Sequence, residues 1–95
     1  MDERRSRLDI ILSVLSAIRD GAEKPTRIMY ASNLSWGPIQ KILASLVEQE
    51  LVTEFVEERG KRSKRRFLIN EKGLSVIDYF AKADSLFDME ILTKD

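Results

Sequence analysis

The sequence predicts a mainly α-helical domain with one small β-hairpin, a fold of the α+β class. The chain has 95 residues, which is the size of one domain with one core. Two segments before residue 51 repeat apolar residues with the period of a helix, and two short segments after it favour strands. A long apolar segment then follows from residue 74 to residue 92, and its length is typical of a helix.

The first segment predicts a helix from about residue 4 to residue 19. Its apolar residues fall on one helical face: Leu8, Ile11, Leu12, Leu15 and Ile18. Asp20 and Gly21 would end it, because glycine readily adopts the left-handed conformation found after many helices. A second apolar strip contains Ile10, Val14 and Ala17. This strip either packs inside the same chain or contacts a second copy.

A short second helix is expected after the connector formed by residues 22–25. Thr26 has the side chain of a helix N-cap, so we expect this helix to run from residue 27 to about residue 32. Pro25 and Tyr30 are placed to pack together across the cap, with Tyr30 in the core. Asn33 and Leu34 would form the following turn.

The third helix is predicted for residues 35–50. Ser35 would begin it, and Pro38 fits because the first helical residues need no intrahelical N–H partner. One face carries the apolar stripe Ile39, Ile42, Leu43, Leu46 and Val47. The opposite face carries Trp36, Gly37, Gln40, Lys41 and Ser45. Trp36 either packs in the core or lies exposed on this second face.

Residues 51–57 and 66–69 favour extended structure, and they are expected to pair as a hairpin around a polar loop at residues 58–65. A lone two-stranded hairpin is marginally stable, so it must pack on the helices. Asn70 would cap the last helix. That helix is apolar on more than one face, which favours a partner helix. We therefore expect a homodimer formed through Ile77, Phe80, Phe87 and Ile91, with residues 1–70 as the binding domain and 71–95 as the dimerisation helix.

The composition argues against an enzyme. The chain has no cysteine and no histidine, which removes thiolate chemistry, the commonest general base and the commonest metal ligand. We expect no catalytic residue, no metal, no cofactor and no small-molecule ligand. The sequence contains neither a run of about 18 apolar residues nor a secretory leader, so a cytoplasmic location without membrane contact is expected.

The charges are segregated along the chain. Sixteen basic and sixteen acidic residues give a net charge of zero. Six of the eight residues from 59 to 66 are basic, whereas residues 71–95 carry six acids and three lysines. A concentrated basic patch on a neutral chain predicts local binding of a polyanion.

Two helices joined by a short turn form a helix-turn-helix, and a hairpin with a basic tip extends it to a winged helix. Residues 35–50 would then enter the major groove of DNA, where Gln40 can pair with adenine and Lys41 can reach guanine or phosphate. Arg27, at a helix N-terminus, either contacts phosphate or pairs with an acid. The hairpin tip, residues 58–66, would contact phosphates or the minor groove. The candidate DNA-binding residues are Thr26, Arg27, Ser35, Trp36, Gln40, Lys41, Arg59, Lys61, Arg62, Lys64 and Arg65.

Three stretches resemble the small archaeal winged-helix DNA-binding proteins, and most closely the ten-kilodalton chromatin-associated type. They are Thr26-Arg27-Ile28-Met29-Tyr30 with Asn33-Leu34-Ser35, Ile42-x-x-x-Leu46-x-x-x-Glu50-Leu51-Val52, and Phe67-Leu68-Ile69-Asn70-Glu71-Lys72-Gly73. The resemblance implies a nucleoid-associated dimer, joined by antiparallel C-terminal helices, that binds double-stranded DNA. The sequence departs from these proteins in a longer, more basic hairpin tip and in Asp84, which interrupts one apolar row.

A second function remains open from the sequence. The winged helix would then be a protein-interaction module whose basic hairpin docks an acidic partner. DNA binding requires the hairpin cations and the polar residues of the third helix to act together. A docking module requires an exposed apolar patch away from the dimer contact, and the sequence offers none once the last helix is assigned to dimerisation.

Overall fold

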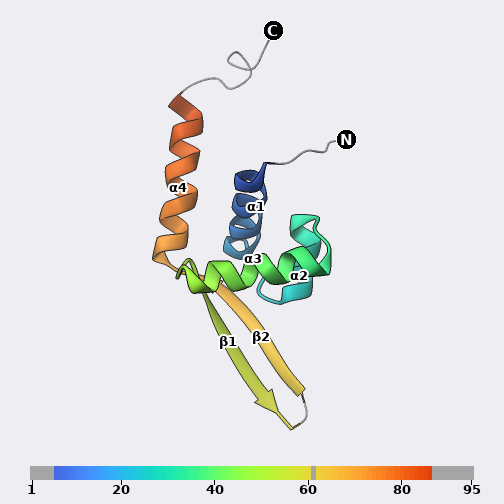
Figure 1. Cartoon of the computed structure of the whole chain (residues 1–95). Coiled ribbons are helices and arrows are strands. Elements are labelled where there is room, and N and C mark those ends of the chain that lie inside the picture. Colours follow the sequence, from blue (N-terminus) through green and yellow to red (C-terminus); the bar gives the residue numbers. More distant parts are fainter. Residues whose placement is uncertain (1–5, 61, 87–95) are drawn as a thin grey trace.

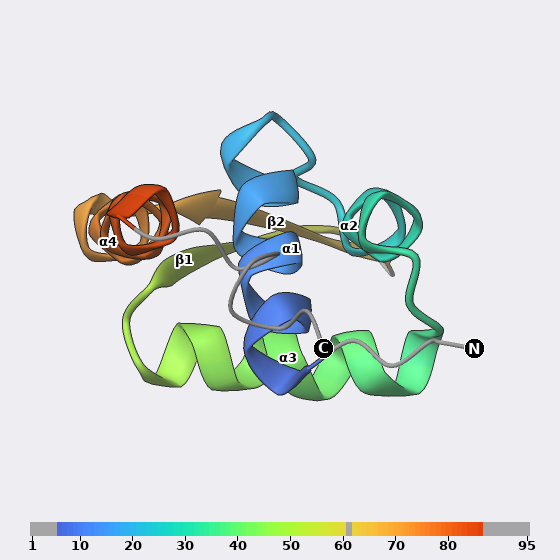
Figure 2. The ribbon, with the colours of Figure 1, turned by 90° about the horizontal axis from the view of Figure 1, so that it is seen from above.

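The computed structural model describes residues 6–60 and 62–86. In the order of the chain, its elements are α1 (Arg7–Arg19), α2 (Pro25–Ser32), α3 (Trp36–Glu48), β1 (Val52–Arg59), β2 (Arg62–Ile69) and α4 (Glu71–Leu86). Figure 1 shows α1, α2 and α3 as a bundle from which the hairpin projects, with α4 rising beside α1. Seen from above, α1 crosses α3 and lies between α2 and α4 (Figure 2). The predicted α+β class and order of elements are confirmed.

Helix α1 begins later than predicted. The Ser6 hydroxyl accepts a hydrogen bond from the backbone N–H of Asp9 at 3.0 Å, and the Asp9 carboxylate accepts one from the N–H of Ser6 at 3.4 Å. This reciprocal capping box begins the helix at Arg7 instead of near residue 4. At the other end, Gly21 adopts a φ of +113°, which agrees with its expected role in ending the helix.

Helix α2 corrects two sequence-based predictions. Lys24 is its N-cap and Pro25 its first residue, so Thr26 lies in the first turn and does not cap the helix. Proline suits that first position because its φ is preset and no N–H is needed there. With the start shifted, Ile28 fills the core and Tyr30 is 77% exposed. The expected contact between Pro25 and Tyr30, and the core placement of Tyr30, are therefore wrong.

Helix α3 follows the prediction closely. Ser35 is its N-cap, and Pro38 is its third residue. The apolar stripe faces inward, with Ile39, Leu43 and Leu46 buried and two neighbours half-buried. The helix ends at Glu48, and Glu50 then adopts a left-handed φ of +61° that turns the chain into β1.

The hairpin strands are longer than predicted, so the expected loop at residues 58–65 is wrong. The strands pair antiparallel from Val52 opposite Ile69 to Arg59 opposite Arg62, and the chain turns at Gly60. Most of the basic residues therefore lie in β2. A run of charges suggests a loop, but here an acid of β1 pairs with a base of β2, as Glu54 does with Arg65 at 2.7 Å. Opposite charges on neighbouring strands stabilise a hairpin, and one face of this hairpin is also buried at Val52 and Phe67.

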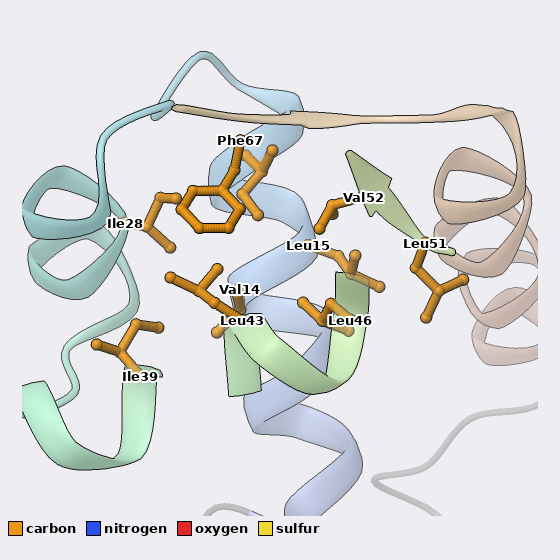
Figure 3. Close-up of a cluster of buried hydrophobic side chains, with 10 residues drawn as sticks. Val14, Leu15, Ile28, Ile39, Leu43, Leu46, Leu51, Val52 and Phe67 are labelled. Atoms are coloured by element: carbon orange, nitrogen blue, oxygen red, sulfur yellow. The ribbon is translucent and has the colours of Figure 1, made fainter. Parts of the chain in front are cut away.

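The fully buried core is formed by the first three helices, the hairpin and Leu51 (Figure 3), and α4 packs Val76 and Ile77 against its edge. Phe67 of β2 is fully buried among aliphatic side chains of the three helices and of β1. The backbone N–H of Phe67 donates to the carbonyl of Glu23 at 2.8 Å, which attaches the hairpin to the connector before α2. Val14 is also fully buried, so its strip on α1 packs within the chain, as one of the two alternatives predicted.

Helix α4 is fixed at its first turn. The Asn70 side chain accepts a hydrogen bond from the N–H of Gly73 at 2.9 Å, which confirms Asn70 as the cap. The same side chain donates to the carbonyl of Glu50 at 2.6 Å, and Lys72 donates to the carbonyl of Gln49 at 2.9 Å. A Cβ on Gly73 would collide with the Leu51 carbonyl oxygen and lie 2.7 Å from the side chain of Ile69. Only glycine allows this approach.

Two glycine-to-alanine variants separate this packing constraint from helix propensity. Gly73→Ala should lower the free energy of unfolding by about 1–3 kcal/mol, because backbone must move to admit the methyl group. Gly37→Ala is the matched control. A Cβ there meets nothing within 4 Å, so it should raise stability by up to about 1 kcal/mol. Urea unfolding followed by circular dichroism measures both, and equal stabilities would contradict this account of α4.

Candidate nucleic-acid interface

The first two turns of α3 present polar side chains to solvent. Ser35 and Lys41 are exposed, and within the described residues Lys41 forms no ion pair. The Ser35 hydroxyl makes no capping hydrogen bond, so it remains available to an external group. Trp36 is 45% exposed at the start of the helix, so it is not a core residue. These groups form one surface that can donate hydrogen bonds and bear positive charge.

A cationic cleft lies between the start of α2 and the hairpin. It has a volume of about 420 Å³ and is lined by Lys24, Pro25, Thr26, Glu57, Lys64, Arg65 and Arg66. Thr26 is exposed in this cleft. Arg27 is also exposed but lines a separate hollow with Asp20 and Tyr30, and it has no ion pair among the described residues. The N-cap Lys24 makes no side-chain hydrogen bond to the helix, so the first N–H groups of α2 have no side-chain partner. Free N–H groups and several cations together favour an anion such as phosphate.

Arg65 connects the hairpin to α3. Its Nε donates to the carboxylate of Glu54 at 2.7 Å, and its Nη1 donates to the Oε1 of Gln40 at 3.1 Å. The guanidinium carbon lies 5.2 Å from the ring centre of Phe67. Arg65 is therefore a partly buried link between two elements, and the prediction that it is a cation of a loop is wrong. Its partners lie 11 and 25 residues away, so no local sequence signal could have identified them.

The other hairpin cations differ in their surroundings. Arg66 pairs with Glu23 at 2.9 Å, which adds a second link between β2 and the connector. Lys64 is exposed and forms no ion pair within the described part of the chain. Arg59 and Arg62 form the last backbone pair of the hairpin, but their side chains are not described. Lys61 lies outside the described residues.

Helix α4 presents a second surface, which is apolar. Of the predicted dimer residues, Ile77 packs on the core of its own chain and Phe80 is half-buried. Phe80 also meets Tyr79 edge-on, with ring centres 5.2 Å apart. Tyr79 and Leu86 are 67% and 83% exposed, and neither is among the predicted dimer residues. The sequence indicates that both are apolar, but it does not indicate which side of the helix is covered by the rest of the chain. Phe87 and Ile91 lie outside the described residues.

Other chemistry is sparse in the described residues. They contain no group of three or more side chains that could hold a metal ion. The Asp20 carboxylate accepts a hydrogen bond from Arg19 and raises the pKa of that guanidinium, but this pair lies at the end of α1, outside the surfaces described above. No described helix combines the length and the hydropathy needed to cross a membrane.

The Arg65 link predicts unequal effects for two neighbouring cations. Arg65→Met should lower the free energy of unfolding by about 1–3 kcal/mol, because Glu54 loses its partner in a partly buried place. Lys64→Met should change it by less than about 0.5 kcal/mol, since an exposed side chain without an ion pair contributes little. Thermal unfolding of both variants measures the difference. Similar losses for the two variants would show that Arg65 is not a structural link.

Comparison with known proteins supports the fold. A family model described as winged helix-turn-helix matches residues 4–88. An uncharacterized protein of the archaeon Methanocaldococcus jannaschii, MJ0287, is 31% identical over 70 residues, which is 74% of this chain. The chain spans 64% of the length of that relative.

Two solved bacterial structures share the fold. The smu.1704 protein of Streptococcus mutans superposes with a TM-score of 0.77 at 18% identity, covering 96% of this chain and 90% of that one. MepR, a transcription regulator of the Staphylococcus aureus multidrug efflux pump MepA, superposes with a TM-score of 0.71 at 10% identity, covering 92% and 64%. MepR has also been solved in complex with DNA, and that structure gives a TM-score of 0.63. At these identities the likeness establishes the fold.

Proposed function

The chain belongs to the winged helix-turn-helix family, and on this basis we propose that it binds double-stranded DNA as a transcription regulator or chromatin-associated protein. Helix α3 enters the major groove, and the hairpin contacts phosphates or the adjacent minor groove. The proposed activity is binding and not catalysis. The structure of MepR with DNA supports this assignment by analogy of fold.

One observation carries the proposal. The polar start of α3 and the cationic cleft are connected through Arg65, which lines the cleft and donates to Gln40. An α-helix fits the major groove of B-form DNA, and hydrogen bonds to phosphates fix its position there. Lys41 and Lys64 are exposed, and we assign them to contacts with such phosphates. A neutral protein with its cations gathered in one region binds DNA through that region alone.

We further propose that two copies associate through α4. Its described apolar side chains exceed what its own core uses, since Tyr79 and Leu86 are both exposed on one side of the helix. A second copy that covers them would place two α3 helices on one duplex, as dimeric winged-helix regulators do. The alternative function, docking of an acidic protein on the hairpin, uses the same cations and makes no use of Gln40.

Charge reversal at the interface tests DNA binding. The double variant Lys41→Glu, Lys64→Glu should weaken binding to all duplexes by about tenfold or more, and it should reduce the salt dependence by roughly one unit of log–log slope per lost phosphate contact. With about four to six phosphate contacts, the unmodified protein should show a slope of about −4 to −5 per protomer. Fluorescence anisotropy of a labelled random duplex of about 30 base pairs, titrated at several salt concentrations, measures both quantities.

Lys82→Glu is the matched control, because Lys82 is exposed on α4, remote from the cleft. It should leave DNA affinity almost unchanged. An equal loss in the control would show that only net charge matters. If the unmodified protein binds no duplex even at low salt, DNA binding is contradicted and docking of an acidic protein is favoured.

A single charge on α4 tests the dimer. Leu86→Asp should give a monomer in sedimentation velocity, because a carboxylate cannot be buried unpaired in an apolar contact. Leu86 is 83% exposed in the single chain, so this change leaves the fold intact. Ser85→Asp adds the same charge about 100° around the helix from Leu86, on the side that carries Asp78, and it should remain dimeric. A dimer in both variants would exclude Leu86 from the contact and contradict this interface.

A further inference from the structure

We propose that Arg65 fixes Gln40 as a hydrogen-bond donor toward DNA, so that this position of α3 selects guanine. The inference rests on the proposed function and specifies how its interface reads sequence. It replaces the adenine pairing expected for Gln40 from the sequence alone. The contact that carries it is the hydrogen bond from Arg65 Nη1 to Gln40 Oε1, at 3.1 Å.

The chemistry of the two groups determines the orientation of the amide. A guanidinium has five N–H donors and no acceptor, so the Gln40 atom that it contacts must be the carbonyl oxygen. The amide nitrogen of Gln40, with its two N–H donors, then lies on the other side of the group. The side chain of Gln40 is half-buried where α3 meets the hairpin, so a 180° flip of its amide is restricted.

Arg65 is itself held in place, which makes the orientation persistent. Its Nε donates to Glu54 at 2.7 Å, and the two side chains are only 33% and 26% exposed. Its guanidinium also lies over the ring of the buried Phe67. Moving Arg65 away would leave a partly buried carboxylate without its partner, which costs more than losing a surface ion pair. The clamp of Glu54, Arg65 and Gln40 is therefore a built part of the free protein.

This orientation matches guanine and not adenine. A glutamine recognises adenine with both ends of its amide, accepting from N6 and donating to N7. Here the oxygen accepts from Arg65 and is turned toward it, so the N–H donors are the groups turned away from the hairpin. The guanine edge in the major groove offers two acceptors, O6 and N7, and the remaining guanidinium N–H groups of Arg65 reinforce that preference. Gln40 and Arg65 together form a cluster that only donates.

The test begins with selection of preferred duplexes from a random pool. The position read by Gln40 is the base pair whose preference disappears in Gln40→Ala. In the unmodified protein this position should be guanine, preferred over adenine by about tenfold, as expected for a good contact to a base edge. In Gln40→Glu a carboxylate oxygen still accepts from Arg65, so folding is retained, but the outward group becomes an acceptor. This variant should lose the guanine preference and favour cytosine, whose N4 donates.

Arg65→Met releases the Gln40 amide, and adenine should then bind within about twofold of guanine. Arg66→Met is the matched control, because Arg66 is the next cation and pairs with Glu23 instead of Gln40. It should weaken binding to all duplexes while leaving the guanine preference intact. Adenine selected by the unmodified protein, or an unchanged preference in Arg65→Met, would overturn the inference while leaving DNA binding in place.

A measurement without DNA tests the clamp itself. Unfolding of Gln40→Ala, Arg65→Met and the double variant forms a double-mutant cycle. Each single variant should raise the unfolding constant by some factor. The product of these two factors should exceed the factor for the double variant by about threefold, because each single change removes the same contact. Independent effects would overturn the clamp. Absence of binding to any duplex would overturn both this inference and the proposed function, so the two failures are distinguishable.

Discussion

The side chain of Asn70 fixes the relative positions of α3, the hairpin and α4. Its oxygen caps α4 through Gly73, and its nitrogen donates to the carbonyl of Glu50, where the chain leaves α3 for β1. Because one amide bonds both segments, the end of α3 and the start of α4 cannot shift independently. Gly73 completes the junction, since only a residue without Cβ lets α4 approach the backbone of Leu51. The spacing between the two proposed surfaces is determined at this point.

The hairpin is attached at a second point through Phe67. Its ring fills the core, its N–H bonds to Glu23, and its other face supports Arg65. The cations of β2 therefore have two functions. Arg65 and Arg66 pair with acids and hold the hairpin against the helices. Lys64, without an ion pair in the described structure, keeps its charge for an external anion.

The order of elements and the apolar stripes could be predicted from the sequence because they depend on local periodicity. The errors lie where a longer-range or positional constraint decides. Thr26 looks like a cap, but Pro25 occupies the first helical position and moves the start to Lys24. The basic run resembles a loop in sequence because strand propensities do not take into account charge pairs between strands, such as Glu54 with Arg65. The bond between Arg65 and Gln40 joins residues 25 apart, so it appears only once the strand register is known.

The separation of basic and acidic residues along the chain explains how a protein of zero net charge can carry a strongly basic region. Residues 71–95 carry six acids and three lysines, whereas six of the eight residues from 59 to 66 are basic. In the field of a duplex, such a chain is attracted at its basic hairpin and repelled at its acidic C-terminal part. The acids therefore do not merely cancel the cations. In the proposed complex they would orient the protein, with α3 and the hairpin toward DNA and the exposed apolar side chains of α4 away from it. That side remains free for a second copy.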